Sequence, residues 1–339
     1  MRCAILSNLL LALTLTFAAT IGVSGDPTVA AAREAANDLR ERQALFQRME
    51  AVTGVPWEYL AAADQWERSV QAVRRDLPKR DGLVALYIPP HVWAGPLNPN
   101  PSDTDPRTVA FFGGMGRDAN GDGRADPNDP EDVAYAFARY LASYGLSDDD
   151  MRIALWEHYG SDRTVRRIEQ FVRIIRAFGT LDLDEKAFPI PRGHHYTYTS
   201  TWGSARGWGG ARIHEGTDIY AAYGTPVVST CYGIVEVMGW NPYGGWRIGI
   251  RDLNNTYHYF AHLSAFQKGL RVGDIVKPGQ RIGYVGSSGY GKPGTSGKFP
   301  PHLHFGLYKD NGRTEWSFDP YPHLKRWERE SRAKGKGRR

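Results

Sequence analysis

The residue composition and the spacing of apolar residues change at Gly179. This change limits the possible fold more than any other feature of the sequence. Before Gly179, helix-forming residues predominate and apolar residues recur at helical spacing. From Tyr196 onward, glycine, aromatic and β-branched residues form short apolar runs separated by turn residues. A chain of 339 residues is long enough for about two domains. We therefore expect an α+β multidomain protein, with an all-α domain followed by an antiparallel β domain.

The expected elements follow from these patterns. We predict helices at Pro27–Ala51, from Pro56 through Val73, and at Glu131–Ser143, Asp148–Tyr159 and Arg163–Phe178. We predict strands at Pro226–Ser229, Gly233–Met238, Arg247–Arg251, Thr256–Ala261, Arg281–Val285 and His302–Tyr308. The predicted parts are a signal segment (1–25), the helical domain (26–178), a linker (179–195), the β domain (196–324) and a disordered basic tail (325–339).

The first 25 residues have the pattern of a secretory signal. A basic Arg2 precedes an uncharged stretch, Ala4–Val23, that ends in small residues. The alternative is a retained membrane anchor, because the stretch approaches the ~20 residues that a span needs. Both interpretations predict a secreted or cell-envelope protein whose membrane contact is limited to this segment. Cleavage leaves Cys231 as a single cysteine, which we interpret as a small buried side chain.

The positive charge of the chain is concentrated at its C-terminus. The formal net charge is +5, while residues 325–339 hold eight basic and two acidic residues. Such a tail is typically solvated, and it can attract anionic wall polymers. An exported chain with a nearly neutral body is not expected to bind nucleic acid.

Two histidine patterns in the β half predict a metal site. His214 and Asp218 are four residues apart in a glycine-containing segment, and His302 and His304 are two apart in a predicted strand. Residues two apart point to the same face of a strand. Two imidazoles and a carboxylate with an open fourth position suit a catalytic zinc ion. The alternative is that each histidine is an ordinary surface or core residue.

The segment from Ile213 to Tyr308 resembles the lysostaphin/LytM type of zinc metallopeptidase. The similarity rests on the histidine patterns and on the motifs around them, which include Phe260–Ser264, Gly286–Gly289 and Pro301–Phe305. This resemblance implies that His214, Asp218 and His304 bind Zn²⁺. It also implies that His262 and His302 lie beside the metal as general base and electrostatic partner. His258 has no place in the family pattern, and we interpret it as structural.

Two positions depart from the family pattern. Trp208 stands where some relatives have a tyrosine, and the loop Tyr290–Pro300 is longer than the usual connection. We expect this loop to form one wall of the substrate cleft. Segments 232–252 and 286–320 are most similar to sporulation members that cut the L-Ala–D-Glu bond of peptidoglycan stem peptides in the spore cortex.

The helical half resembles a degenerate lytic transglycosylase domain of the lysozyme type. The resemblance rests on residues 54–67, and it places Glu67 where those enzymes have their general acid. The loop Gly113–Gly116 lacks the glutamine of the second family signature. We therefore expect this domain to position glycan. The alternative is that Glu67 is an exposed charge on an amphipathic helix.

An acidic loop before the Glu131 helix predicts a Ca²⁺ site. Its spacing matches a calcium-binding loop at the oxygen positions Asp118, Asn120, Asp122, Asp126 and Asp129. The alternative is an acidic turn stabilised by its own side chains. A bound Ca²⁺ would brace the helical domain without taking part in chemistry.

These patterns predict a secreted zinc endopeptidase whose partner is peptidoglycan, through its stem peptides and its glycan. Two other classes stay open. One is a wall-binding regulator without activity, although such relatives lose metal ligands and this chain keeps all of them. The other is a glycan-cleaving transglycosylase that uses Glu67.

Overall fold

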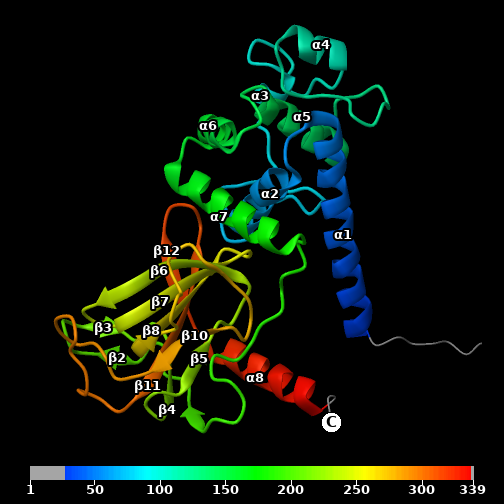
Figure 1. Cartoon of the computed structure of the whole chain (residues 1–339). Helices are drawn as coiled ribbons and strands as arrows, with labels where there is room; N and C mark the ends of the chain where they lie inside the picture. The colour runs from blue at the N-terminus through cyan, green and yellow to red at the C-terminus, as the bar shows by residue number, and fades with distance from the viewer. Residues whose placement is uncertain (1–26, 337–339) are drawn as a thin grey trace, which may run out of the picture.

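The computed structural model describes residues 27–336, and it describes side chains for residues 34–333. A helical region lies above a β-sheet domain, and a C-terminal helix packs against the far side of that domain (Figure 1). This arrangement agrees with the α+β order predicted from the sequence. Within residues 27–336, no helix has the length and apolar character needed to cross a bilayer. The predicted signal segment lies outside the described residues.

The helical region follows the predicted pattern closely. Its elements are α1 (Pro27–Thr53), α2 (Trp57–Gln71), α3 (Pro90–Ala94), α4 (Pro106–Phe111), α5 (Pro130–Ala142), α6 (Asp148–Tyr159) and α7 (Asp162–Phe178). Local chemistry sets the helix ends. Ser147 and Asp150 form a capping box at the start of α6. Gly160 and Gly179 adopt left-handed conformations that end α6 and α7, respectively.

The β domain is built on one antiparallel sheet. Its strands are β1 (Tyr196–Tyr198), β4 (Thr217–Ala221), β5 (Pro226–Val228), β6 (Gly233–Asn241), β7 (Gly245–Asp252), β8 (Thr256–Phe266), β9 (Ile275–Val276), β10 (Arg281–Val285), β11 (His302–Asp310) and β12 (Glu315–Phe318). The main order is β1-β4-β11-β8-β7-β6-β9; β12 pairs with β11, β10 pairs with β8, and β5 pairs with β10. A separate ribbon pairs β2 (Ala205–Arg206) with β3 (Arg212–Ile213).

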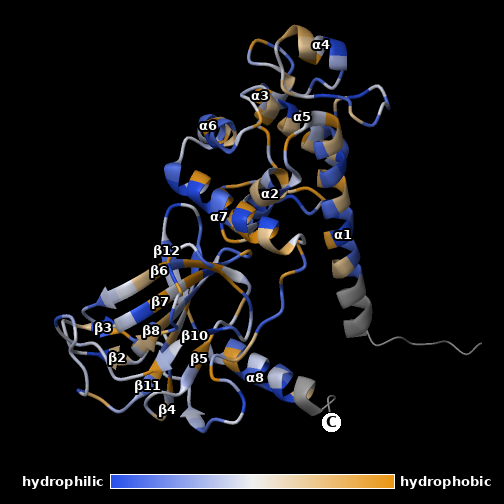
Figure 2. Cartoon of the chain, in the orientation of Figure 1, coloured by the Kyte–Doolittle hydropathy of each residue, from blue (hydrophilic) through white to orange (hydrophobic). Residues whose placement is uncertain are grey.

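The two faces of the sheet differ in chemistry. Ile248, Phe260 and Phe305 point to one face and form part of the domain core. Residues that alternate with them, among them Tyr259 and His304, point to the other face. The hydropathy colouring shows this mixture of apolar and polar residues along the strands (Figure 2). The face that carries Tyr259 and His304 is therefore not part of the apolar core and can hold a polar site.

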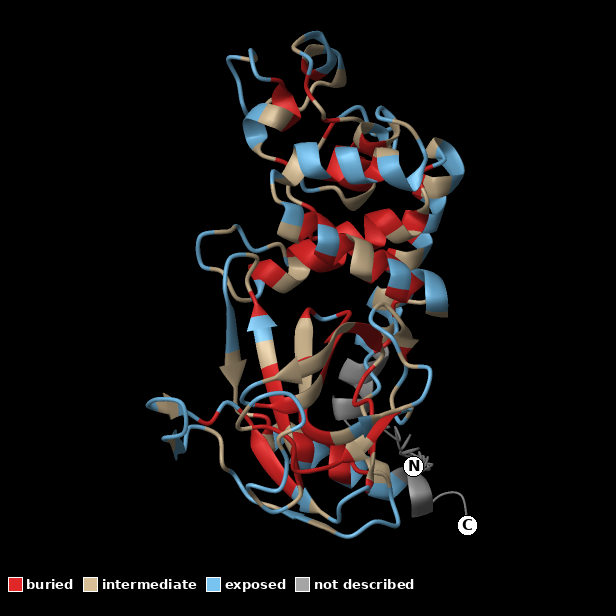
Figure 3. Cartoon of the chain, turned by 60° about the vertical axis from the view of Figure 1, so that its left-hand side comes forward, coloured by how far each residue is buried: buried red, intermediate tan, exposed pale blue. Residues whose placement is uncertain are grey.

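The helical region and the sheet share buried contacts. Ile234 and Leu253 of the β domain belong to the same apolar cluster as the helices. Buried Asp310 forms ion pairs with Arg163 at 2.9 Å and with Arg167 at 3.3 Å. Both arginines belong to α7. Buried residues predominate along the helical segments nearest the sheet (Figure 3). The shared apolar cluster and these ion pairs connect the two regions.

The prediction of a disordered tail is wrong for the part of the tail that the structure describes. Helix α8 covers Tyr321–Lys336. Leu324 and Trp327, three residues apart, are buried in the β-domain core, and Glu328 accepts hydrogen bonds from two tyrosines of β1. These apolar contacts stabilise the helix. The many basic residues of this segment had led to the prediction of disorder.

Candidate active site

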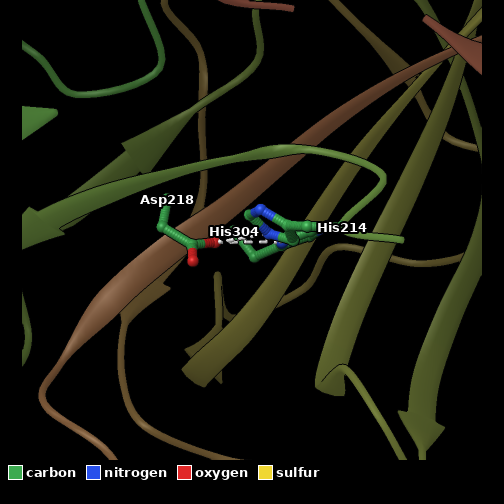
Figure 4. Close-up of side chains that lie close together, drawn as sticks. All are labelled: His214, Asp218 and His304. Atoms are coloured by element: carbon green, nitrogen blue, oxygen red, sulfur yellow. Dashed lines mark hydrogen bonds and ion pairs between the residues drawn. The ribbon is translucent and has the colours of Figure 1, made fainter. Parts of the chain in front are cut away.

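Three potential metal ligands converge on the open face of the sheet. The Nε2 atom of His214 lies 3.0 Å from Oδ1 of Asp218, and Nδ1 of His304 lies 3.1 Å from the same oxygen. The two imidazole nitrogens are 2.8 Å apart. Asp218 and His304 are direct partners in the register of β4 and β11, which places their side chains together (Figure 4). His214 and Asp218 are buried, and the side chain of His304 is 13% exposed.

This arrangement fits a zinc ion. Tetrahedral ligands about 2.0–2.1 Å from zinc lie about 3.3 Å from one another, close to the separations seen here. Two imidazoles and one carboxylate form a three-ligand set that leaves a fourth position open, as catalytic zinc sites do. Of the two potential metal-ligand clusters among the described residues, this one lies in the cleft.

Neighbouring groups orient these ligands. The ring of His214 donates from Nδ1 to the carbonyl of Thr201 at 2.9 Å, which leaves Nε2 with its lone pair toward the site. Arg206 donates to Oδ2 of Asp218 at 2.6 Å and leaves Oδ1 facing the histidines. A Cβ atom on Gly216 would lie 2.6 Å from Cε1 of His304, so the ring needs glycine at that position. Sequence reasoning missed Thr201 and Arg206, since neither belongs to a motif.

His262 and His302 also face the centre of the site. Nδ1 of His302 donates to the carbonyl of Pro300, and its Nε2 lies 3.7 Å from Oδ1 of Asp218. Nδ1 of His262 donates to the carbonyl of Ser288 at 2.7 Å. Because a carbonyl only accepts, both rings keep an unprotonated Nε2. His262 has a φ of +61°, a rare conformation for a non-glycine residue that often marks a functional position.

Burial controls the charge of this cluster. It lowers the pKa values of His262, His302 and His304 below that of free histidine, so these rings are neutral and hold free lone pairs. Burial raises the pKa of Asp218, but its polar contacts with His214 and His304 outweigh burial and hold that pKa well below the usual range. An ionised carboxylate beside neutral imidazoles is the protonation state that metal binding requires.

The site opens into a cleft of about 880 Å³. Tyr290, Phe299 and Pro300 line it, which confirms that the loop predicted at Tyr290–Pro300 forms one wall. Phe299 packs against His262 with ring centroids 4.6 Å apart. Trp208 stacks on Tyr290 at 4.8 Å and supports this wall from outside.

Glu67 of the helical region is buried, so the interpretation of Glu67 as an exposed charge is wrong. Burial raises its pKa to about 7, and the polar groups of Tyr159 and Gln71 beside it oppose the shift. Gln71 donates to it at 3.3 Å. These partners come from α2 and α6, inside the helical region, and the lysozyme-like identity of that region stays a prediction.

The acidic loop uses its oxygens for its own backbone. Both carboxylate oxygens of Asp118 accept loop amide protons, and the side chains of Asn120, Asp122 and Asp126 accept from amides two residues on. Asp129 caps α5. Within this described loop, no three carboxylates bring ligand atoms within 4.8 Å of one another. Calcium binding stays a prediction.

A second cluster combines Cys231, Asp252 and His258. Cys231 is buried, as predicted, and burial raises the pKa of its thiol. The ammonium group of Lys186 lies 3.5 Å from Asp252 and balances its charge. His258 bridges Asp252 and the hydroxyl of Thr230. Because Lys186 already provides a positive charge beside Asp252, the cluster needs no metal ion for charge balance. This fits the structural role expected for His258.

Comparison with known proteins agrees with this geometry. Residues 212–318 match the model of peptidase family M23. The L-Ala–D-Glu endopeptidase of Bacillus subtilis is 60% identical over 291 residues, which cover 86% of this chain and 89% of that protein. The chain belongs to peptidase family M23. This membership confirms the prediction of a metallo-endopeptidase of the lysostaphin/LytM type.

Other relatives match a smaller share of the chain. Lysostaphin of Staphylococcus simulans is 36% identical over 115 residues, which cover 33% of this chain and 22% of lysostaphin. A solved structure of a glycyl-glycine endopeptidase from Ruminococcus gnavus is 36% identical, covers 54% of this chain and 73% of its own, and has a TM-score of 0.39.

Proposed function

We propose that this protein is a zinc-dependent endopeptidase that hydrolyses the L-Ala–D-Glu bond in peptidoglycan stem peptides. The observation that carries the proposal is the convergence of His214, Asp218 and His304 in an open cleft, within a chain that is 60% identical to an L-Ala–D-Glu endopeptidase. That identity extends over 86% of the chain and therefore includes much of the helical region.

We assign the three converging residues as metal ligands. Zinc held there would polarise the scissile carbonyl and lower the pKa of a water molecule. Thr201 and Arg206 act through the ligands: they fix the tautomer of His214 and the orientation of Asp218.

We assign His262 as the general base and His302 as its electrostatic partner. Each ring is anchored through Nδ1 to a backbone carbonyl, and each keeps a basic Nε2 toward the cleft. The buried His262 would accept the proton of the attacking water and return it to the leaving amine. His302, 3.7 Å from Asp218 by its Nε2, would act as the electrostatic partner once that Nε2 carries a proton, because only a protonated nitrogen can donate to the developing oxyanion.

Three further predictions from the sequence, on location, biological role and glycan binding, form part of this proposal. We propose a secreted or cell-wall location, a role in spore cortex maturation, and a helical domain (26–178) that holds glycan while the peptidase domain (196–324) cuts. The wall-binding alternative is disfavoured because all ligands are present and oriented. No contact described above favours glycan cleavage, since Glu67 is closed in by Gln71 and Tyr159.

A digest tests the proposal directly. The purified chain is incubated with peptidoglycan, with and without a zinc chelator, and new chain ends are identified by mass spectrometry. We expect new amino groups on D-Glu that disappear with chelator and in His304→Ala. Anhydro-sugar ends that survive both treatments would move the chemistry to Glu67 and overturn the proposal.

A further inference from the structure

Two arginines in the cleft have no acidic partner. Arg212, two residues before His214, and Arg247, on β7, both line the cavity that holds the metal-ligand cluster. Among the described residues, neither forms an ion pair within 4.0 Å. Other arginines of the same cleft region do. Arg206 is paired with Asp218, and Arg251 is paired with two glutamates.

Both guanidinium groups are held in place without being neutralised. Each side chain is half-buried, and each Nε atom is covered and lacks a hydrogen-bond partner. The guanidinium of Arg212 lies over the ring of Tyr243, 5.0 Å from its centroid. Such positioning keeps a cation oriented at little entropic cost when it binds an anion.

A tyrosine connects these arginines to the metal ligands. The Tyr259 ring lies 5.8 Å from the His304 ring, centroid to centroid. Arg247 lies two residues from Gly249, the register partner of Tyr259, and therefore on the same face of the sheet. Arg212, Arg247 and Tyr259 line the same cavity. The guanidinium groups of the two arginines therefore lie about the length of one side chain, that of Tyr259, from the proposed ligand His304. An extended peptide advances about 3.3 Å per residue, so they face a residue one or two positions from the scissile bond.

We propose that Arg212 and Arg247 bind a free carboxylate of the substrate, on a residue beside the scissile bond, and so select anionic stem peptides. The inference rests on the proposed function and names its substrate more closely. D-Glu has two carboxyl groups, and when one continues the peptide chain the other stays free. A planar guanidinium pairs with a carboxylate through two parallel hydrogen bonds. A glycyl-glycine bond offers no such group.

The test compares two peptides that differ in one charge. Both contain an L-Ala–D-Glu bond and end in an amide, so that D-Glu carries the single free carboxylate of one peptide and a carboxamide in the other. The double variant Arg212→Gln/Arg247→Gln is compared with the wild-type chain and with Arg281→Gln. Arg281 is an exposed arginine of β10 that packs on Tyr284, away from the cleft. Zinc content and Tm are measured for every protein.

We expect the wild-type chain to cut the carboxylate peptide with a kcat/KM about 10- to 100-fold higher than that of the amide peptide, as charge-assisted hydrogen bonds permit. The double variant should lose this preference, mainly through KM, and keep its zinc. Arg281→Gln should keep the preference, and the lysine variants of both positions should restore part of it.

Three results would overturn the inference. If the wild-type chain cuts both peptides equally well, the bond assignment stands and the subsite is wrong. If the double variant slows both peptides by the same factor while zinc and Tm are normal, the arginines do not read the carboxylate. If the wild-type chain cuts neither peptide but releases other ends from peptidoglycan, the proposed bond is wrong and the subsite falls with it.

Discussion

The peptidase domain and the helical region each bury a carboxylate, and the two carboxylates have opposite properties. Asp218 lies among three histidines and Arg206, and its pKa is held well below the usual range although burial acts to raise it. Glu67 is enclosed by an amide and a phenol, and burial raises its pKa to about 7. Both side chains are less than a tenth exposed.

The difference shows that partners, and not burial, make a metal site. Asp218 is ionised and aims one oxygen at two imidazole nitrogens in an open cleft. Glu67 makes its contacts inside the helical region, where a neutral carboxyl group costs less than a charged one. We therefore propose that Asp218 belongs to the metal site where peptides are cut. We propose a structural role for Glu67.

The largest expected effect separates the two carboxylate regions by activity. His304→Ala removes a proposed metal ligand, and we expect it to lower kcat/KM on a stem peptide by at least about 1,000-fold, because a bound metal would supply several kcal/mol of transition-state stabilisation. Glu67→Gln should stay within about threefold of the wild-type chain. A steady-state peptide assay with matched Tm measurements decides between them. Loss of peptide cleavage in a folded Glu67→Gln chain would break the comparison.

The second effect concerns the boundary between the two regions. Asp310→Ala leaves Arg163 and Arg167 without the carboxylate that they share, and Arg167 is itself buried. We expect a loss of about 3–5 kcal/mol in the free energy of unfolding, measured by urea denaturation. The control Glu330→Ala removes an exposed pair with Arg326 and should cost less than about 1 kcal/mol. Equal costs would show that the boundary contacts do not hold the regions together.

The third effect is a pH dependence of stability. The folded-state pKa of Glu67 is about 7, above the value of about 4.3 in an unfolded chain. The folded state therefore binds the proton more tightly, so stability is lost as pH rises from about 4 to 7. Glu67→Gln should stabilise the fold by up to about 3 kcal/mol at pH 8 and by little at pH 4. Thermal unfolding at both pH values measures this, with the exposed Glu41→Gln as the matched control variant.

The smallest effect tests the support of Asp218. Arg206→Gln removes the ion pair to Oδ2 and leaves the ligands in place. We expect zinc affinity to fall about 10- to 100-fold, as for other partners of metal ligands. Competition with a chromophoric chelator measures the affinity, and exposed Arg271→Gln is the control. Unchanged affinity in Arg206→Gln would mean that Asp218 needs no support.

Strongly periodic segments were predictable from the sequence. Helix α6 and strand β10 have the predicted bounds, because their caps and turns are local. Strand β4, which carries Asp218, was not predicted: it has five residues and is defined by its pairing with β1 and β11. Helix α8 was missed because its apolar contacts lie on the distant sheet core.

The site was predictable in its residues but not in its surroundings. The alternation of side chains along a strand placed His302 and His304 together, and both lie within 3.7 Å of Asp218. Thr201 and Ser288 act through backbone carbonyls, which carry no residue-type signal. Arg206 reaches Asp218 from the β2–β3 ribbon, whose two-residue strands have no sequence pattern.

The central claim is that His214, Asp218 and His304 hold the metal that cuts peptide bonds, and a metal titration tests it most directly. The metal-free chain receives zinc in steps while stem-peptide cleavage and bound zinc are followed together. We predict that activity rises in proportion to zinc, reaches its plateau at one equivalent, and is absent in His304→Ala, which should bind zinc weakly. Full peptide cleavage by the metal-free chain, or by His304→Ala without zinc, would contradict the account.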